Sequence, residues 1–222
     1  MYPPPDTSAS TPRGEDTREA LLLAATTVFA RAGFDGVSLR EVAEAAKVNQ
    51  ALIGYHFGSK EGLYLAVFER IAAQIRAAVG TSLDGIETVL GAKPAADRHA
   101  LLGSVVALTD AMLGVLASER SAPWAQLIAR EQQAPTAAFT LLYDAFMGRV
   151  LSLLTRLVRK LKPRESDLSA RLLVATILGQ VMVFRVARAG VLRHMQWQQI
   201  GATELAAVQA RMRRNLEALL AE

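Results

Sequence analysis

Two side-chain amides, Asn49 and Gln50, stand where a short helical pattern begins. A side-chain amide pairs bidentately with the N6 and N7 atoms of adenine in a DNA major groove, so Gln50 is a candidate for reading a base. Asn49 is a candidate either for base contact or for capping the helix, because Asn is preferred at N-caps. Ser38 begins an earlier helical pattern, and its hydroxyl can cap that helix and also donate to a phosphate.

Two short helices separated by a tight turn must position these side chains. Ser38 and Glu41 have the spacing of a capping box, which fixes the start of the first helix. Lys47-Val48 turns the chain, and the second helix is expected to run from Gln50 to Phe57. Two helices so close in sequence resemble a helix-turn-helix, whose second helix enters the major groove.

The same unit needs two further helices. Apolar residues at three- and four-residue spacing predict an amphipathic helix over 17–32, ended by a left-handed Gly33 with an apolar Phe34 beyond it. A fourth helix is expected to begin near Lys60 and to reach about Val79. We therefore expect a compact helix-turn-helix domain over residues 15–62.

Beyond Gly80 a loop containing Gly85, Gly91 and Pro94 is expected, followed by helical patterns near 99–117, 123–133, 135–161, 166–192 and 202–220. No strand alternation competes with them. The sequence therefore predicts an all-α protein of about nine helices, with a second domain over 63–222. Its most apolar stretch, 172–184, has 13 residues and falls short of the ~20 that span a bilayer, which favours a buried helix and no membrane partner.

Composition narrows the class of protein. The 222 residues are 51% hydrophobic and contain no cysteine, which excludes disulfides and thiolate chemistry and fits a cytoplasmic protein. Residues 1–14 are rich in proline and polar residues and are expected to be a disordered tail. Three scattered histidines, without metal-ligand spacing or a phosphate-binding glycine loop, argue against an enzyme, a metal site or a cofactor.

Charge is distributed unevenly along the chain. The net charge is +4, but residues 1–80 carry 8 Lys and Arg against 9 Asp and Glu, whereas residues 81–222 carry 17 against 12. DNA binding by the first part must therefore depend on individually placed residues. The strongest basic run, 156–164, is interpreted as favourable charge at a helix C-terminus rather than as a second DNA or membrane site.

These residues resemble the TetR-type bacterial transcriptional repressors. The likeness covers about 50 residues, and the residues that carry it are Leu22, Ala24-Ala25, Phe29, Gly33-Phe34, Ser38 to Ala43, Tyr55-His56-Phe57 and Ser59 to Tyr64. Looser similarity to the CecR-like subgroup, which controls efflux and drug-tolerance genes, is carried by 129–139, Gly179-Gln180, Phe184-Arg185 and 191–193 with Trp197.

The resemblance implies a homodimer that places two recognition helices in successive major grooves of double-stranded operator DNA. It also implies a C-terminal domain that binds a small-molecule effector and releases the operator, with the last two helices forming the dimer interface. At matching positions, Arg40 is expected to reach a base edge, and Tyr55, His56 and Lys60 are expected to grip phosphates. The candidate DNA contacts are thus Ser38, Arg40, Asn49, Gln50, Ala51, Tyr55, His56 and Lys60.

Each assignment has a simpler alternative. For Arg40 the alternative is a solvated charge, and for His56 it is a core histidine beneath Phe57. Three positions depart from the family pattern, because Lys47 replaces a turn glycine, Leu52 a small or hydroxyl residue, and Gly54 a frequent tyrosine. These departures bear on the operator sequence. The rival to a DNA reader is a helical adaptor that uses the helix-turn-helix for protein contacts.

The second domain offers candidates for an effector pocket. Aromatic residues and a few polar residues lie on apolar helical patterns, as expected for a pocket with groups that orient a ligand. The alternative is a helical core with one internal salt bridge. The candidate ligand-binding residues are Trp124, Arg130, Glu131, Phe139, Tyr143, Gln180 and Phe184.

Overall fold

Helices make up every regular element in the computed structural model, which describes residues 12–221. The all-α prediction is confirmed for this range. Backbone contacts divide the chain into two compact units, with the boundary between Arg70 and Ile71, inside the long helix α4 (Lys60–Gly91). The tail expected at 1–14 lies outside the described residues except for 12–14, which form the first turn of α1.

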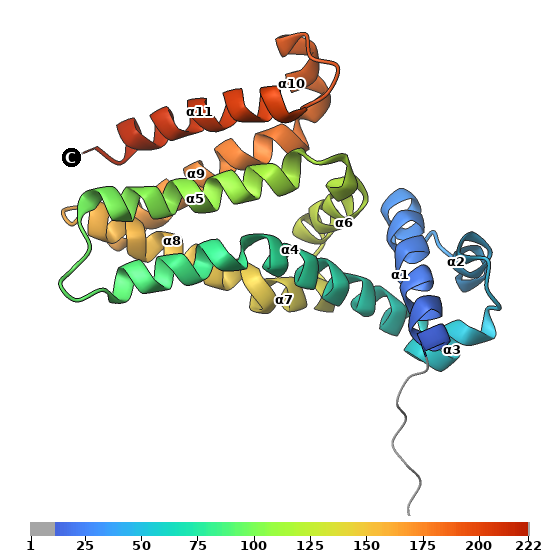
Figure 1. Cartoon of the computed structure of the whole chain (residues 1–222). Helices are drawn as coiled ribbons and strands as arrows, with labels where there is room; N and C mark the ends of the chain where they lie inside the picture. The colour runs from blue at the N-terminus through green and yellow to red at the C-terminus, as the bar shows by residue number, and fades with distance from the viewer. Residues whose placement is uncertain (1–11, 222) are drawn as a thin grey trace, which may run out of the picture. The chain divides into compact units, whose positions relative to one another are not determined.

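The first unit contains α1 (Pro12–Ala32), α2 (Leu39–Ala46), α3 (Ala51–Phe57) and the start of α4 (Figure 1). An aromatic cluster holds α1 against α4, because the ring of Tyr64 lies 5.0 Å from that of Phe29 and 5.1 Å from that of Phe34. Gly33 adopts a left-handed conformation with φ 76°, which confirms the predicted end of α1. Helix α2 packs in turn against α1.

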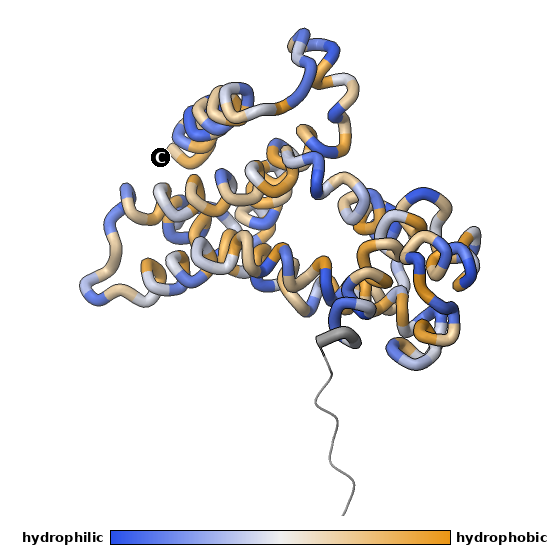
Figure 2. The backbone as a smooth tube through the Cα atoms, turned by 45° about the vertical axis from the view of Figure 1, so that its right-hand side comes forward, coloured by the Kyte–Doolittle hydropathy of each residue, from blue (hydrophilic) through white to orange (hydrophobic). Residues whose placement is uncertain are grey.

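The second unit is a helical bundle around α5. Its elements are α5 (Arg98–Ala117), η1 (Glu119–Ser121), α6 (Ala122–Gln133), α7 (Ala137–Leu142), η2 (Tyr143–Met147), α8 (Gly148–Leu161), α9 (Asp167–Val186), α10 (Arg188–Met195) and α11 (Ala202–Leu219). Helix α5 packs against α8, α9 and α11. Figure 2 shows apolar and polar residues alternating along these helices, as expected when each helix buries one face.

Arg98 ties three helix ends together in this bundle. Its guanidinium donates to the carbonyl of Leu161 at 3.0 Å, at the end of α8, and also to the carbonyl of Leu220 just after α11. The last carbonyl groups of a helix have no partner within the helix, so a side-chain donor satisfies them. Arg98 therefore links the start of α5 to the ends of α8 and α11.

Helix α4 is longer than predicted. The sequence suggested an end near Val79 and a loop through Gly85, but the helix continues to Gly91. A glycine within a helix costs about 1 kcal/mol relative to alanine. Burial of Leu83 and Ile86, with 1% and 0% of their surface exposed, offsets this local preference.

Two predicted helices are interrupted. The segment expected as one helix over 166–192 breaks at Ala187, which separates α9 from α10. The segment expected over 135–161 begins only at Ala137, capped by Thr136, and contains the π-helical turn η2 between α7 and α8. These interruptions raise the number of separate elements within residues 12–221 above the nine or so expected.

Three helical stretches, 98–117, 137–161 and 167–186, are long and apolar enough to cross a membrane by length and composition alone. The apolar segment that seemed too short at 172–184 is thus part of a 20-residue helix, α9. In the second unit these stretches pack against one another, through contacts of α5 with α8 and α9 and of α8 with α9.

Candidate DNA-binding and effector sites

Lys47 and Val48 close the turn between α2 and α3. Lys47 has φ 57° and ψ 41°, a left-handed conformation. Its N–H donates to the carbonyl of Glu44 at 3.1 Å, and the N–H of Val48 donates to the carbonyl of Ala43 at 3.0 Å. These hydrogen bonds satisfy carbonyls at the end of α2. The turn therefore has the geometry that favours glycine, although lysine occupies it.

Replacing Lys47 with glycine is expected to stabilise the protein. A side chain in the left-handed region costs about 1 kcal/mol, so Lys47→Gly should raise the free energy of unfolding by about that amount. Thermal and urea denaturation of Lys47→Gly and Lys47→Ala measure the effect. The alanine variant keeps the Cβ atom and should show no comparable gain; an equal gain would mean that loss of the charge, rather than relief of strain, is responsible.

The capping box at the start of α2 is present. The Ser38 hydroxyl accepts from the Glu41 N–H at 3.2 Å and lies 2.9 Å from the Glu41 carboxylate, to which it donates; the Ser38 N–H donates to the same carboxylate at 2.7 Å. The backbone hydrogen bond from Ser38, followed by that from its hydroxyl, lowers the pKa of Glu41. A phosphate contact by Ser38 would replace its hydroxyl's hydrogen bond to Glu41.

Arg40 lies on the exposed side of α2. Its Nε atom is 2.8 Å from the Glu44 carboxylate, and 80% of its side chain is exposed. The hydrogen bond to Glu44 raises the pKa of Arg40, so the guanidinium remains charged. An exposed ion pair one helical turn apart contributes little to stability. Arg40 can therefore exchange Glu44 for a base or a phosphate at small cost.

Helix α3 has an exposed face that begins at Gln50. The Asn49 side chain accepts from the Ala51 N–H at 2.9 Å, which confirms that Asn49 caps the helix. Gln50 is exposed and makes no capping hydrogen bond. Ala51, Gly54 and Tyr55 share the exposed side, with Tyr55 81% exposed, whereas Ile53 is fully buried. A helix anchored on one face and open on the other suits insertion into a groove.

His56 and Lys60 are more enclosed than the other candidates. The His56 ring lies 5.0 Å from that of Tyr55 and 6.0 Å from that of Phe57. The Lys60 ammonium lies 4.6 Å from the centre of the Phe34 ring, a cation–π contact. Lys60 must leave this ring to reach a phosphate.

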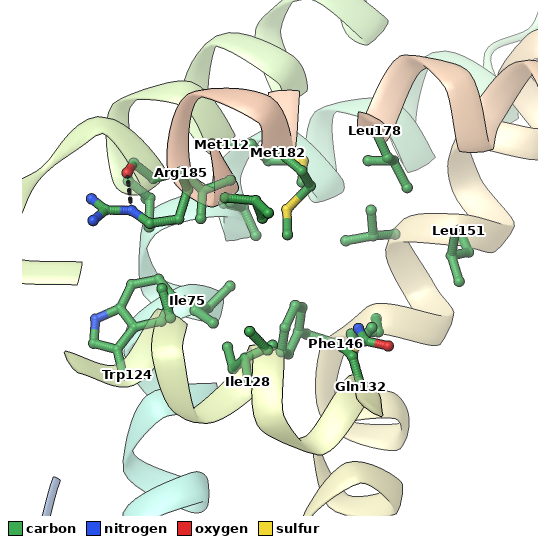
Figure 3. A pocket seen from close by; sticks show the side chains of 18 residues that line it. Ile75, Met112, Trp124, Ile128, Gln132, Phe146, Leu151, Leu178, Met182 and Arg185 are labelled. Atoms are coloured by element: carbon green, nitrogen blue, oxygen red, sulfur yellow. Dashed lines mark hydrogen bonds between the residues drawn. The ribbon is translucent and has the colours of Figure 1, made fainter. Parts of the chain in front are cut away.

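The second unit contains an apolar cavity of about 280 Å³ (Figure 3). Residues of α4, α5, α6, η2, α8 and α9 line it, and nearly all of the lining surface is apolar. Aromatic and aliphatic side chains face one another across it in Figure 3, among them Ile75, Met112, Trp124, Phe146 and Met182. Such a cavity suits the apolar part of a small molecule.

Gln132 and Arg185 are the polar residues in the wall. Arg185 donates to the carbonyl of Leu116 at 2.7 Å and to the Ser121 hydroxyl at 2.8 Å. Burial, followed by the nearby charge of Arg188, lowers the pKa of Arg185. Its guanidinium is turned away from Met182 in Figure 3. Arg185 is therefore engaged in holding α9 to the end of α5.

The predicted ligand residues are divided between wall and scaffold. Trp124 lines the cavity, whereas the other six predicted residues do not. Glu131 is buried and accepts from the N–H and the hydroxyl of Thr136, both at 2.9 Å, which anchors the start of α7. Gln180 accepts from the Asn215 amide at 3.0 Å and joins α9 to α11.

The remaining four predicted residues lie outside the wall for other reasons. Arg130 is exposed and Phe184 is half-buried away from the cavity. Phe139 and Tyr143 pair with each other at 6.2 Å. Because the π-helical turn inserts an extra residue into the helical period, Phe146 rather than Tyr143 reaches the cavity.

Methionines mark the cavity better than the aromatic residues do. Met112, Met147 and Met182, half of the six methionines in the chain, line it. Methionine is flexible and fills irregular space, and adaptable binding surfaces are rich in it. Three methionines on separate apolar helical patterns were therefore a usable signal. Within residues 12–221, no group of three or more His, Asp or Glu residues is placed to bind a metal ion.

Two family models match the chain. Residues 21–67 match the tetR family of bacterial regulatory proteins, and residues 103–222 match the C-terminal domain of the HTH-type transcriptional dual regulator CecR. The chain is 30% identical over 191 residues to CecR from Shigella flexneri, covering 85% of this chain and 84% of that protein. It is 39% identical over 66 residues to the transcriptional repressor NicS from Pseudomonas putida, covering 30% and 31% of the two chains.

Solved structures share the fold. A TetR-like regulator from Rhodococcus sp. RHA1 aligns with a TM-score of 0.64 at 18% identity, covering 93% of this chain and 97% of that one. AibR, solved with isovaleryl coenzyme A and operator DNA, aligns with a TM-score of 0.65 at 15% identity, covering 92% and 98%. The two family models and the near full-length relative assign the chain: it belongs to the TetR family of bacterial regulators, with a CecR-type C-terminal domain, and is a DNA-binding transcriptional regulator.

Proposed function

We propose that the protein acts in the cytoplasm as a homodimeric repressor, without catalytic activity or a cofactor, and that a small molecule in the apolar cavity releases it from its operator. We infer efflux or drug-tolerance genes as its targets only from the resemblance of the sequence to the CecR-like subgroup. Because the Shigella relative is described as a dual regulator, activation is the second candidate outcome.

The long helix α4 contains both a candidate DNA contact and part of the cavity wall. Lys60, a candidate phosphate contact, is the first residue of α4, and Ile75 and Val79 of the same helix line the cavity. A ligand that displaces Ile75 must move or strain α4, and α4 is covalently continuous with the helix-turn-helix. This continuity supports coupling between ligand binding and DNA binding, because both events act on one continuous helix.

The dimer is supported by an apolar stripe on α9. Leu168, Leu172, Val183 and Val186 are exposed by 68%, 58%, 40% and 71%. With the exposed Ala175 and Gly179 they recur at three- and four-residue spacing, on the side of α9 opposite its buried residues. A continuous exposed stripe of this kind is typical of a helix that packs against a second copy. We propose that α9 and α11 form this interface.

Selection of bound duplexes from a random library, followed by gel-shift titration, tests the function. Loss of a bidentate base contact costs about 1–3 kcal/mol. Gln50→Ala is therefore expected to weaken binding to the selected operator about 5- to 150-fold and to relax the preference at one base pair. Lys60→Ala should weaken binding to all sequences alike and reduce the salt slope by about one.

Lys93→Ala is the matched control, because Lys93 is an exposed lysine between α4 and α5. It should leave operator affinity unchanged. Failure to bind any duplex at low salt would favour the adaptor. A reporter gene placed behind the selected operator separates repression from activation, and an increase in expression when the protein is present would overturn the repressor assignment.

A further inference from the structure

A basic groove adjoins the apolar cavity. The groove has a volume of about 450 Å³ and lies between η2, α8 and α9. Leu151 lines both the cavity and the groove. Figure 3 places Leu151 and Leu178 across the cavity from Trp124. The groove therefore opens beside one end of the cavity.

Positive charge predominates in the groove. Arg156, Arg159 and Arg171 line it with a single carboxylate, Asp167, which gives a net charge of +2. Asp167 is shared, because it lies 3.3 Å from Arg159 and 2.7 Å from Arg171. Arg156 makes no ion pair or hydrogen bond with another side chain within residues 12–221. One guanidinium is therefore available to an anion.

The two helices lead from the cavity into the groove. On α8 the residues run from Leu151 at the cavity to Arg156, a rise of about 7–8 Å at 1.5 Å per residue. On α9, which also lines both sites, Leu178 faces the cavity and Arg171 faces the groove. Side chains of an α-helix lean toward its N-terminus, which places Arg156 on the cavity side of the groove.

We propose that the effector is an anionic amphiphile whose apolar body fills the cavity and whose anionic group binds in the basic groove at Arg156. This inference rests on the proposed function for the identity of the cavity as the effector site. The cavity of about 280 Å³ is apolar and suits the apolar body of such a ligand. No Asp or Glu lines the cavity, so a cationic ligand finds no partner there.

Four probes with the same ten-carbon chain test the charge of the ligand: decanoate, decanoyl-coenzyme A, decanol and decyltrimethylammonium. Binding is measured by tryptophan fluorescence in a Trp197→Phe background, which leaves Trp124 in the cavity wall as the only tryptophan. At low salt we expect at least one anionic probe to bind about tenfold or more tighter than decanol. The difference in affinity between the anionic probe and decanol should become smaller at 0.5 M salt, because salt strongly screens exposed charges.

Arg156→Ala should reduce the affinity for the anionic probe about fivefold and leave that for decanol unchanged. Lys160→Ala is the matched control, since it removes one positive charge from the same helix at a residue that lines neither site. A larger affinity for decanoyl-coenzyme A than for decanoate would identify phosphates as the anionic group, and a larger affinity for decanoate would identify a carboxylate. Either result supports the proposal.

Equal binding of decanol and both anions would overturn the proposal, as would tightest binding of the cation or equal effects of Arg156→Ala and Lys160→Ala. The proposed function is judged separately by operator binding of the ligand-free protein. If the protein binds its operator and prefers no anionic probe, the proposed ligand class is wrong, whereas the proposed function as a DNA-binding regulator is supported. If the protein prefers an anionic probe and binds no duplex, the proposed ligand class is supported, whereas the proposed function as a DNA-binding regulator is wrong.

Discussion

Replacing Gly62 with alanine is expected to destabilise the helix-turn-helix unit by about 2–4 kcal/mol, the range of a severe steric substitution. A Cβ atom at Gly62 would lie 2.1 Å from the carbonyl oxygen of Phe57 and 3.2 Å from its carbonyl carbon. Both are backbone atoms, so no side-chain rotation relieves the clash. The chain would have to move at the junction of α3 and α4, where the Gly62 N–H donates to the Ser59 hydroxyl at 3.0 Å.

Gly54→Ala is the matched control in the same unit. A Cβ atom at Gly54 meets nothing within 4 Å, and alanine improves helix propensity by about 1 kcal/mol at most. Urea denaturation should therefore show Gly62→Ala destabilised and Gly54→Ala unchanged or stabilised. Similar stabilities for the two variants would contradict the steric explanation and leave the glycine content of the segment unexplained.

The same control variant tests why Gly54 is present. If the absence of a side chain allows α3 to approach DNA closely, Gly54→Ala should lose operator affinity in a gel shift despite its higher stability. Undiminished affinity would exclude close approach as the reason for Gly54. Stability and DNA binding are thus expected to change in opposite directions at this position, and in the same direction at Gly62.

The helix ends that were predicted correctly depend on interactions between residues close together in the sequence. The cap at Ser38, the cap at Asn49 and the left-handed end at Gly33 each depend on one residue and on backbone groups within a few positions of it. The length of α4 depends on contacts distant in sequence, which bury Leu83 and Ile86 and outweigh the glycines between Val79 and Gly91. Local preference was the wrong guide there.

The cavity wall was predictable only in part for a related reason. Residue type identified Trp124, but the direction of each later side chain depends on helical register. The π-helical turn at 143–147 changes that register within an apparently continuous helix, and Phe146 faces the cavity as a result. Glu131 and Gln180 were wrongly predicted to line the ligand pocket. Each accepts a hydrogen bond from another residue of the fold, Glu131 from Thr136 and Gln180 from Asn215.

Gly179→Leu is expected to raise the dissociation constant of the proposed dimer by about 100-fold or more. Within the protomer a Cβ atom at Gly179 meets nothing within 4 Å, and leucine is a better helix former than glycine by several tenths of a kcal/mol. Each protomer should therefore remain folded. In a dimer joined through the α9 stripe, however, Gly179 and Ala175 are the small residues at its centre, and a leucine would hold the two helices apart.

Light scattering and sedimentation at protein concentrations of 1–100 μM measure the association of the protomers. Gly103→Leu is the matched control, because Gly103 also lies on a helix with open space around its Cβ position. Gly179→Ala should give an intermediate loss, which tests the graded steric effect without a large side chain. Operator affinity should fall with dimer affinity, since a monomer contacts only one half-site. A stable Gly179→Leu dimer would contradict the α9 interface, whereas a monomeric Gly103→Leu would show that bulk on any exposed helix disrupts association. Because a Cβ atom at Gly179 meets nothing within 4 Å in the protomer, a selective loss of association at Gly179 would indicate a clash with the second copy.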